Sequence, residues 1–167
     1  MLMHPNTYPN THPHTQPHTA FLPRCLAVAA FAWGCTAACA QTDVEIGQIK
    51  VSRGPVIVQR GAQVLDGAVG LRLRAQDAVK TGADGAVGIT MRDNGTLSLG
   101  PNSVLTLAQF EFDETSHQGR FDSLLQRGTL AMTSGRLAKQ SPQAVQVRTP
   151  TAVLGVRGTE LLVAVEP

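Results

Sequence analysis

Short alternations of apolar and polar residues fill most of the chain. Val87, Ile89 and Met91 place three apolar side chains on one face of an extended segment, and Val145 and Val147 alternate with polar neighbours in the same way. Alternation with a period of two is typical of half-buried strands. No segment offers a helical stripe of two or more turns, so the pattern predicts an all-β fold built from many short strands.

Turn residues, above all glycine, divide these strands. The strand over Ser103–Phe112 is expected to break near Ala108 and Gln109, and the segments Phe121–Leu125 and Leu130–Met132 are expected to pair around Gly128. Frequent glycines favour tight corners. The expected architecture is therefore a stack of short strands, with a β-solenoid-like arrangement preferred and an elongated β-sandwich as the alternative.

The first forty residues differ from the rest in composition. Pro, His, Thr and Asn dominate up to Pro23, and Arg24 then precedes the uncharged run Cys25–Ala38. A basic residue, a short apolar run and the small-x-small site at Ala38 and Ala40 predict a secretory signal. A membrane span needs about 20 apolar residues, which is longer than this run. We therefore expect a leader over residues 1–40 and a mature domain over 41–167.

Cleavage after Ala40 would leave Gln41 as the first mature residue. Lipidation at Cys39 is the alternative, although the aliphatic residue expected three positions earlier is missing. His-rich tracts can bind metals, but His4, His12, His14 and His18 precede the signal and would be removed with it. The leader therefore predicts a periplasmic or secreted protein and no metal site of its own.

Removal of the leader simplifies the chemistry of the mature chain. All three cysteines lie before Gln41, which excludes a disulfide framework. The net charge falls from +2 for the full chain to about +1, because the leader carries one basic residue and no acidic one. No basic stripe with interleaved aromatic residues is present, so nucleic acid is not an expected partner.

Groups suited to catalysis are few. The single histidine after residue 40, His117, lies in a polar loop beside Ser116, and a nucleophile needs a base that its side chain can reach. Adjacent residues rarely provide that geometry. We therefore expect no enzymatic activity, no catalytic residues and no cofactor.

Carboxylates gather around the same loop. Glu111, Asp113 and Glu114 lie together, with Asp122 beyond them. Two carboxylates can divide acid and base roles, and hard cations bind carboxylate oxygens. Strand alternation instead indicates a solvated face that carries Glu111 and Asp113, with a weak calcium site as the alternative. No loop of the EF-hand type supports a metal ion here.

Two further patterns concern surfaces. Arg72 and Arg74 alternate with leucines, which predicts an exposed strand face or a surface for an acidic partner. Alternation also predicts that Phe110, Phe112 and Phe121 belong to the core, which lowers the case for a sugar-binding platform.

Five glycine-containing blocks follow one another along the chain. They are GQIKV at Gly47–Val51, DAVKTG at Asp77–Gly82, DNGTLSLGPNS at Asp93–Ser103, GTL at Gly128–Leu130 and TPTAVLGVRGTE at Thr149–Glu160. This ordered set resembles the FecR domain, a periplasmic all-β module of bacterial signalling proteins. The resemblance is more specific for the fold than for the function, because a fold does not imply a function.

The last block is the most informative. Thr149 and Pro150 predict a break between two strands, and Gly155 and Gly158 are expected to mark bulges or close backbone approaches. Arg157 would be a charge inside an apolar strand, which is costly unless it is paired. We expect Arg157 to pair with a carboxylate such as Glu160 or Asp77, and Thr159 completes the structural signature.

The resemblance also bears on function. Regulators of the FecR type join a cytoplasmic anti-sigma segment and a membrane span to this periplasmic domain, and the sequence shows neither. We therefore expect an exported binding or signalling module whose partner is another envelope protein or a second copy. A structural cell-surface subunit and a module that binds glycan or peptidoglycan are the alternatives, and the latter would need a polar groove that the sequence does not announce.

Overall fold

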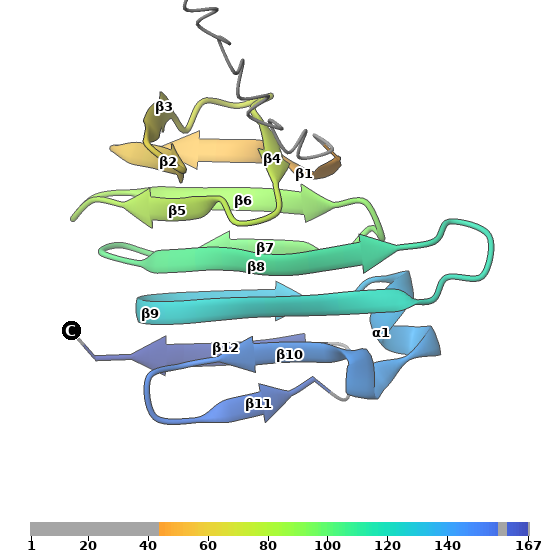
Figure 1. Ribbon diagram of the computed structural model, residues 1–167. Coiled ribbons are helices and arrows are strands. Elements are labelled where there is room, and N and C mark those ends of the chain that lie inside the picture. Colours follow the sequence, from red (N-terminus) through yellow and green to blue (C-terminus); the bar gives the residue numbers. More distant parts are fainter. Residues whose placement is uncertain (1–43, 157–159, 167) are drawn as a thin grey trace, which may run out of the picture. The chain divides into compact units, whose positions relative to one another are not determined.

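The computed structural model describes residues 44–156 and 160–166, which belong to one compact unit, Ala40–Pro167. Twelve strands make up most of this unit (Figure 1). They are β1 (Glu45–Arg53), β2 (Val56–Arg60), β3 (Gln63–Asp66), β4 (Arg72–Arg74), β5 (Ala78–Thr81), β6 (Ala86–Met91), β7 (Thr96–Leu99), β8 (Val104–Phe112), β9 (Gly119–Thr133), β10 (Val145–Arg148), β11 (Val153–Gly155) and β12 (Glu160–Val165). A short helix α1 (Arg136–Gln140) and a 3₁₀ turn η1 (Pro142–Ala144) connect β9 to β10.

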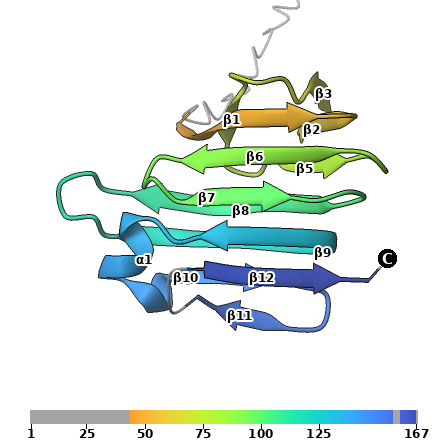
Figure 2. The ribbon, with the colours of Figure 1, turned by 180° about the vertical axis from the view of Figure 1, so that it is seen from behind.

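The strands form one curled sheet whose two halves face each other. One half holds β3, β2, β5, β8, the first part of β9, β10 and β11, and the other holds β4, β1, β6, β7, the second part of β9 and β12. Strands β2, β5, β8 and β10 lie in front in Figure 1, and β1, β6, β7 and β12 lie in front in Figure 2. Neighbouring strands pair antiparallel except for β9 and β10. The all-β prediction is confirmed, and antiparallel pairing across two facing halves fits a sandwich better than the parallel coils of a solenoid.

Strand β9 joins the two halves by folding back on itself. Arg127 still pairs with Val104 on β8, whereas Gly128 already pairs with Val165 on β12. Gly128 has a φ of 87°, which glycine adopts without the steric penalty of a Cβ. The expectation of two separate strands around Gly128 is therefore wrong, because the glycine bends one continuous strand.

A register shift replaces the predicted break in β8. The strand is continuous from Val104 to Phe112, and its pairing with β9 shifts between Thr106 and Gln109. An extra residue in one strand of a pair bends that strand without ending it. The sequence signal near Ala108 and Gln109 was thus located correctly, but it marks a bulge.

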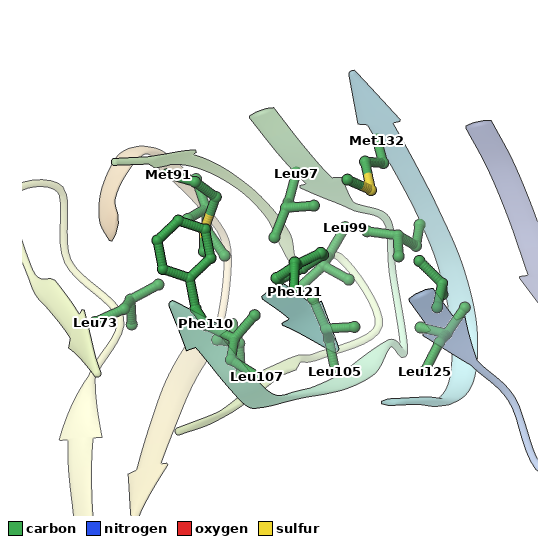
Figure 3. Packing of buried hydrophobic residues seen from close by; sticks show 14 of the residues in the cluster. Leu73, Met91, Leu97, Leu99, Leu105, Leu107, Phe110, Phe121, Leu125 and Met132 are labelled. Carbon is green, nitrogen blue, oxygen red and sulfur yellow. The ribbon is translucent and has the colours of Figure 1, made fainter. Parts of the chain in front are cut away.

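The core lies between the two halves (Figure 3). Along β6 the burial alternates strictly, with Val87, Ile89 and Met91 inside, as the sequence predicts. Phe110 and Phe121 are also buried and meet edge to face, with ring centroids 6.0 Å apart, while Phe112 packs against the core and is partly exposed. Burial of this apolar surface is the main favourable term that holds the halves together.

Helical structure contributes little to this unit. The five residues of α1 bury Leu137 and Ala138 in the core cluster. Within the described residues, we find no helix with the length and apolar character that a membrane span requires.

The bend at Gly128 provides a test of the architecture. A Cβ at this position would lie 2.5 Å from the Cα of Ser103, so alanine must displace backbone as well as adopt a strained φ. We expect Gly128→Ala to lower the free energy of unfolding by roughly 2–5 kcal/mol, from backbone strain plus overpacking.

Gly61 is the matched control, since its φ is 56° and a Cβ there meets nothing within 4 Å. Gly61→Ala should cost only about 1 kcal/mol. Equal shifts of the denaturant midpoint for the two variants would show that β9 does not depend on close packing at its bend.

Candidate functional site

The described part of the C-terminal block contains the turn before β11, strand β11 and the first residue of β12. Thr149 and Pro150 begin the turn between β10 and β11, as predicted. The backbone N–H of Thr149 donates to the carbonyl oxygen of Ala152 at 2.8 Å, and the N–H of Ala152 donates to Oγ1 of Thr149 at 3.0 Å. A threonine side chain that bonds the backbone within a turn stabilises it locally. These residues therefore shape a hairpin.

Gly155 differs from its prediction. It pairs with Gln146 in regular register at the end of β11, and a Cβ built on it meets nothing within 4 Å. The expected bulge or close approach at Gly155 is therefore wrong. The remaining signature residues, Arg157, Gly158 and Thr159, lie outside the described residues, as do the predicted cleavage positions Ala38, Ala40 and Gln41.

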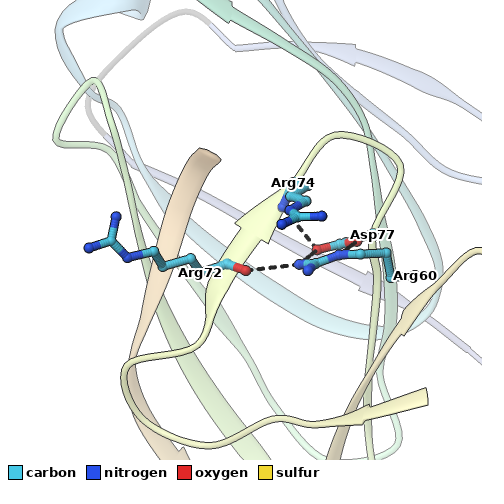
Figure 4. A network of polar contacts seen from close by, with 4 residues as sticks. All are labelled: Arg60, Arg72, Arg74 and Asp77. Carbon is cyan, nitrogen blue, oxygen red and sulfur yellow. Dashed lines mark hydrogen bonds and ion pairs between the residues drawn. The ribbon is translucent and has the colours of Figure 1, made fainter. Parts of the chain in front are cut away.

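Asp77, one of the carboxylates proposed to pair with Arg157, is the centre of a different network (Figure 4). Nε and Nη2 of Arg60 donate to its two carboxylate oxygens at 2.9 and 2.7 Å, and the backbone N–H of Arg74 donates to Oδ2 at 2.9 Å. Only 1 % of the Asp77 side chain is exposed. Arginine can bind a carboxylate through two parallel hydrogen bonds, which adds geometric specificity. Asp77 is thus a structural anchor whose partner is Arg60.

The same network joins the two halves of the sheet. Arg60 ends β2 in one half, and its Nη2 also donates to the carbonyl oxygen of Arg72, on β4 in the other half, at 2.8 Å. Arg60 is not among the candidate residues that the sequence predicted. The signal that could have indicated its role is the acidic residue that opens the DAVKTG block, because a buried carboxylate needs a charged or hydrogen-bonding partner.

Other polar residues of the family-like blocks also support the fold. Thr81 Oγ1 donates to the carbonyl oxygen of Gly100 at 2.7 Å and accepts from the N–H of Ser103 at 2.9 Å. The hydroxyl of Ser103 accepts the N–H of Thr129 at 2.9 Å. Both Thr81 and Ser103 are buried. Buried polar groups are stable when their hydrogen bonds are satisfied, so these residues fix turns.

Asp113 organises the polar loop around His117. Oδ1 of Asp113 accepts the backbone N–H groups of Thr115 and Ser116 and also the Ser116 hydroxyl, at 3.0, 2.6 and 2.9 Å. The Ser116 bonds are the main cause that lowers the pKa of Asp113 below its ordinary value. The His117 ring stacks on Phe112 with centroids 6.0 Å apart. The serine is thus bonded to a carboxylate that organises the loop.

The neighbouring carboxylates Glu114 and Asp122 each form an ion pair with an arginine. Oε1 of Glu114 accepts from Nη2 of Arg92 at 2.9 Å, and this hydrogen bond is the main cause that lowers the pKa of Glu114. Asp122 accepts from Nε of Arg148 at 2.8 Å. In the part of the chain that the structure describes, no group of three or more His, Cys, Asp or Glu side chains is arranged to hold a metal ion.

A match to a protein-family model contains four of the five blocks and leaves out the first, Gly47–Val51. Residues 77–167, more than half of the chain, match the family model described as FecR protein. No curated protein and no solved structure matches. The chain belongs to the FecR protein family. The match begins at Asp77, the buried anchor of the polar network.

The Arg60–Asp77 ion pair gives a direct stability test. Arg60→Ala leaves the buried carboxylate of Asp77 without its charged partner, and we expect a loss of roughly 3–5 kcal/mol in the free energy of unfolding. Arg92→Ala is the control, because its partner Glu114 is two-thirds exposed and a surface pair contributes about 0–1 kcal/mol. Denaturant unfolding of the two variants measures the difference. Similar losses would contradict the assignment of Asp77 as the anchor.

Proposed function

We propose that this protein is an exported, non-catalytic FecR domain that binds another envelope protein by strand addition at β12. Membership of the FecR family supports a role in envelope signalling. Arg24, the apolar run and the site at Ala38 and Ala40 support export. The observation that carries the proposal is the open edge of β12, which lies inside the family match.

Strand β12 differs from the other edge strands in the described region. It pairs with β9 along one side from Glu160 to Val165, and no second strand pairs with it among the described residues. The other edges are shorter: four residues in β3 and three each in β4 and β11. Proteins commonly protect edges by short strands, bulges, lysine or proline. β12 has six residues, contains neither lysine nor proline, and keeps a regular register.

Alternate side chains of β12 face the core and the solvent, as expected for an edge strand that accepts an added strand. Val163 is buried in the core, and Leu161 and Val165 pack against it, which holds the strand in place. Leu162 points outward with 76 % of its surface exposed. In strand addition, backbone hydrogen bonds supply affinity and alternate side chains supply specificity. Leu162 provides an apolar contact beside the unpaired backbone.

A catalytic role has less support. The one histidine of the described residues stacks on Phe112, and Ser116 bonds to Asp113. The buried polar groups of the family-like blocks are engaged in turns and in the Arg60–Asp77 pair. A nucleophile and base within reach of each other are the minimum for covalent catalysis, and these contacts favour a binding module.

The test is capture of a partner from envelope extracts by the mature protein and by Leu162→Lys. A charge on an edge strand opposes strand addition, so Leu162→Lys should reduce recovery of the partner at least tenfold. Because Leu162 is exposed, the free energy of unfolding of Leu162→Lys should differ from that of the wild type by only about 0.5 kcal/mol. Val64→Lys is the matched control, since Val64 is 65 % exposed on the edge strand β3.

Hydrogen exchange of the complex identifies the surface used. Slower exchange of the β12 amides supports strand addition, and equal recovery with wild type and Leu162→Lys contradicts it. Self-association that depends on Leu162, measured by light scattering, would show that the partner at β12 is a second copy of this chain and not another envelope protein. Recovery of polysaccharide alone would favour the glycan-binding alternative.

A further inference from the structure

An open polar groove lies on the half of the sheet formed by β1, β4 and β6. Its volume is about 640 Å³, which falls within the range of about 300–1,000 Å³ typical of small-molecule sites. Polar side chains from β1, β4, β6 and the turn after β6 reach it, namely Gln48, Lys50, Arg72, Thr90 and Arg92. Their neighbours along the strands, including Ile49, Leu73 and Ile89, are buried in the core, so the groove faces outward.

Strand register brings these side chains together. Gln48 on β1 lies directly opposite Arg72 on β4 and, on its other side, directly opposite Thr90 on β6. Side chains of directly opposed residues lie about 5 Å apart on the same face of a sheet. The three residues therefore form one row across the strands, although they are far apart in the sequence.

The charge of the groove is predominantly positive. Among the described lining residues, Lys50, Arg72 and Arg92 contribute three cations and Glu45 contributes the one carboxylate. Arg72 pairs with Glu45, and Arg92 donates to Glu114 at 2.9 Å. Lys50 Nζ donates to Oε1 of Gln48 at 2.5 Å. A guanidinium has five N–H donors and an ammonium three, so each of these contacts leaves donors for a ligand.

The buried network described above fixes the backbone that presents Arg72. Arg60 holds the carbonyl oxygen of Arg72 at 2.8 Å, while the Arg72 side chain points away from Asp77 (Figure 4). Its side chain is 65 % exposed. A fixed backbone with an outward guanidinium places the cation at a defined point of the groove.

We propose that this groove binds a small ligand that carries two or more phosphate or carboxylate groups. Guanidinium groups bind both kinds of anion through paired hydrogen bonds, and three separated cations match an anion with more than one charged group. The described lining contains no aromatic side chain, so it offers no stacking platform for a neutral sugar. Most of the groove lies before Asp77, outside the family match, and the site is independent of the β12 edge.

The first test titrates the mature protein with sodium pyrophosphate and follows backbone amide shifts. We expect saturable shifts centred on β1, β4 and β6. Lys50→Gln combined with Arg92→Gln should weaken binding at least tenfold. Arg53→Gln removes a cation from the exposed end of the same strand β1, outside the groove, and should leave binding unchanged. Loss of binding in Arg53→Gln to the same extent, or shifts spread over all strands, would overturn the proposal.

Two further probes separate the sources of the anion. Tricarballylate tests a ligand with several carboxylates, and phosphatidylcholine vesicles with added cardiolipin test a lipid head group that carries two phosphates. Binding of any probe that weakens in the Lys50→Gln, Arg92→Gln variant supports the site and identifies its class of ligand. Failure of all three probes to bind, or binding that this variant leaves unchanged, overturns it. Partner capture through β12 is measured separately, so either proposal can fail alone.

Discussion

A buried carboxylate that must keep its partners is the constraint on which much of this structure depends. Asp77 accepts two hydrogen bonds from the Arg60 side chain and one from the N–H of Arg74, and it is almost fully removed from solvent. Loss of a single partner would strand a charge in the interior, which costs far more than a surface pair contributes. The network therefore fixes β2 against β4 and defines where the two halves of the sheet meet. It also sets the backbone position from which Arg72 reaches the groove.

Several residues of the family-like blocks have a structural role in this arrangement. Asp77 anchors the halves, Thr81 and Ser103 fix adjoining turns, and Gly128 lets β9 pass from one half to the other. These roles explain how short blocks can specify one fold without specifying a ligand. The two proposed binding surfaces use exposed side chains outside the core, namely Leu162 on β12 and the polar row of the groove.

Sequence reasoning predicted the fold class and most strand positions because alternation reports burial directly. Val87, Ile89 and Met91 show this most clearly, since each is buried as expected. The prediction failed for features that depend on contacts between residues distant in the sequence. Gly128 looked like a hairpin corner, and only the pairing of its neighbours with β8 and β12 reveals a bend within one strand. The groove was not predicted either, because Gln48, Arg72 and Thr90 meet through register and not through sequence spacing.

The Arg60 side chain offers the most direct test of the central constraint. Its Nε proton is held by Asp77 and its side chain is 22 % exposed. In a ¹H–¹⁵N correlation spectrum at neutral pH, the Nε–H signal of Arg60 should be visible, because this proton should exchange slowly with water. It should also show NOEs to protons of Asp77 and of β4. Arg53, exposed at the end of β1, supplies the reference for a solvated guanidinium. Exchange of the Arg60 proton as fast as that of Arg53 would contradict the buried anchor and the account built on it.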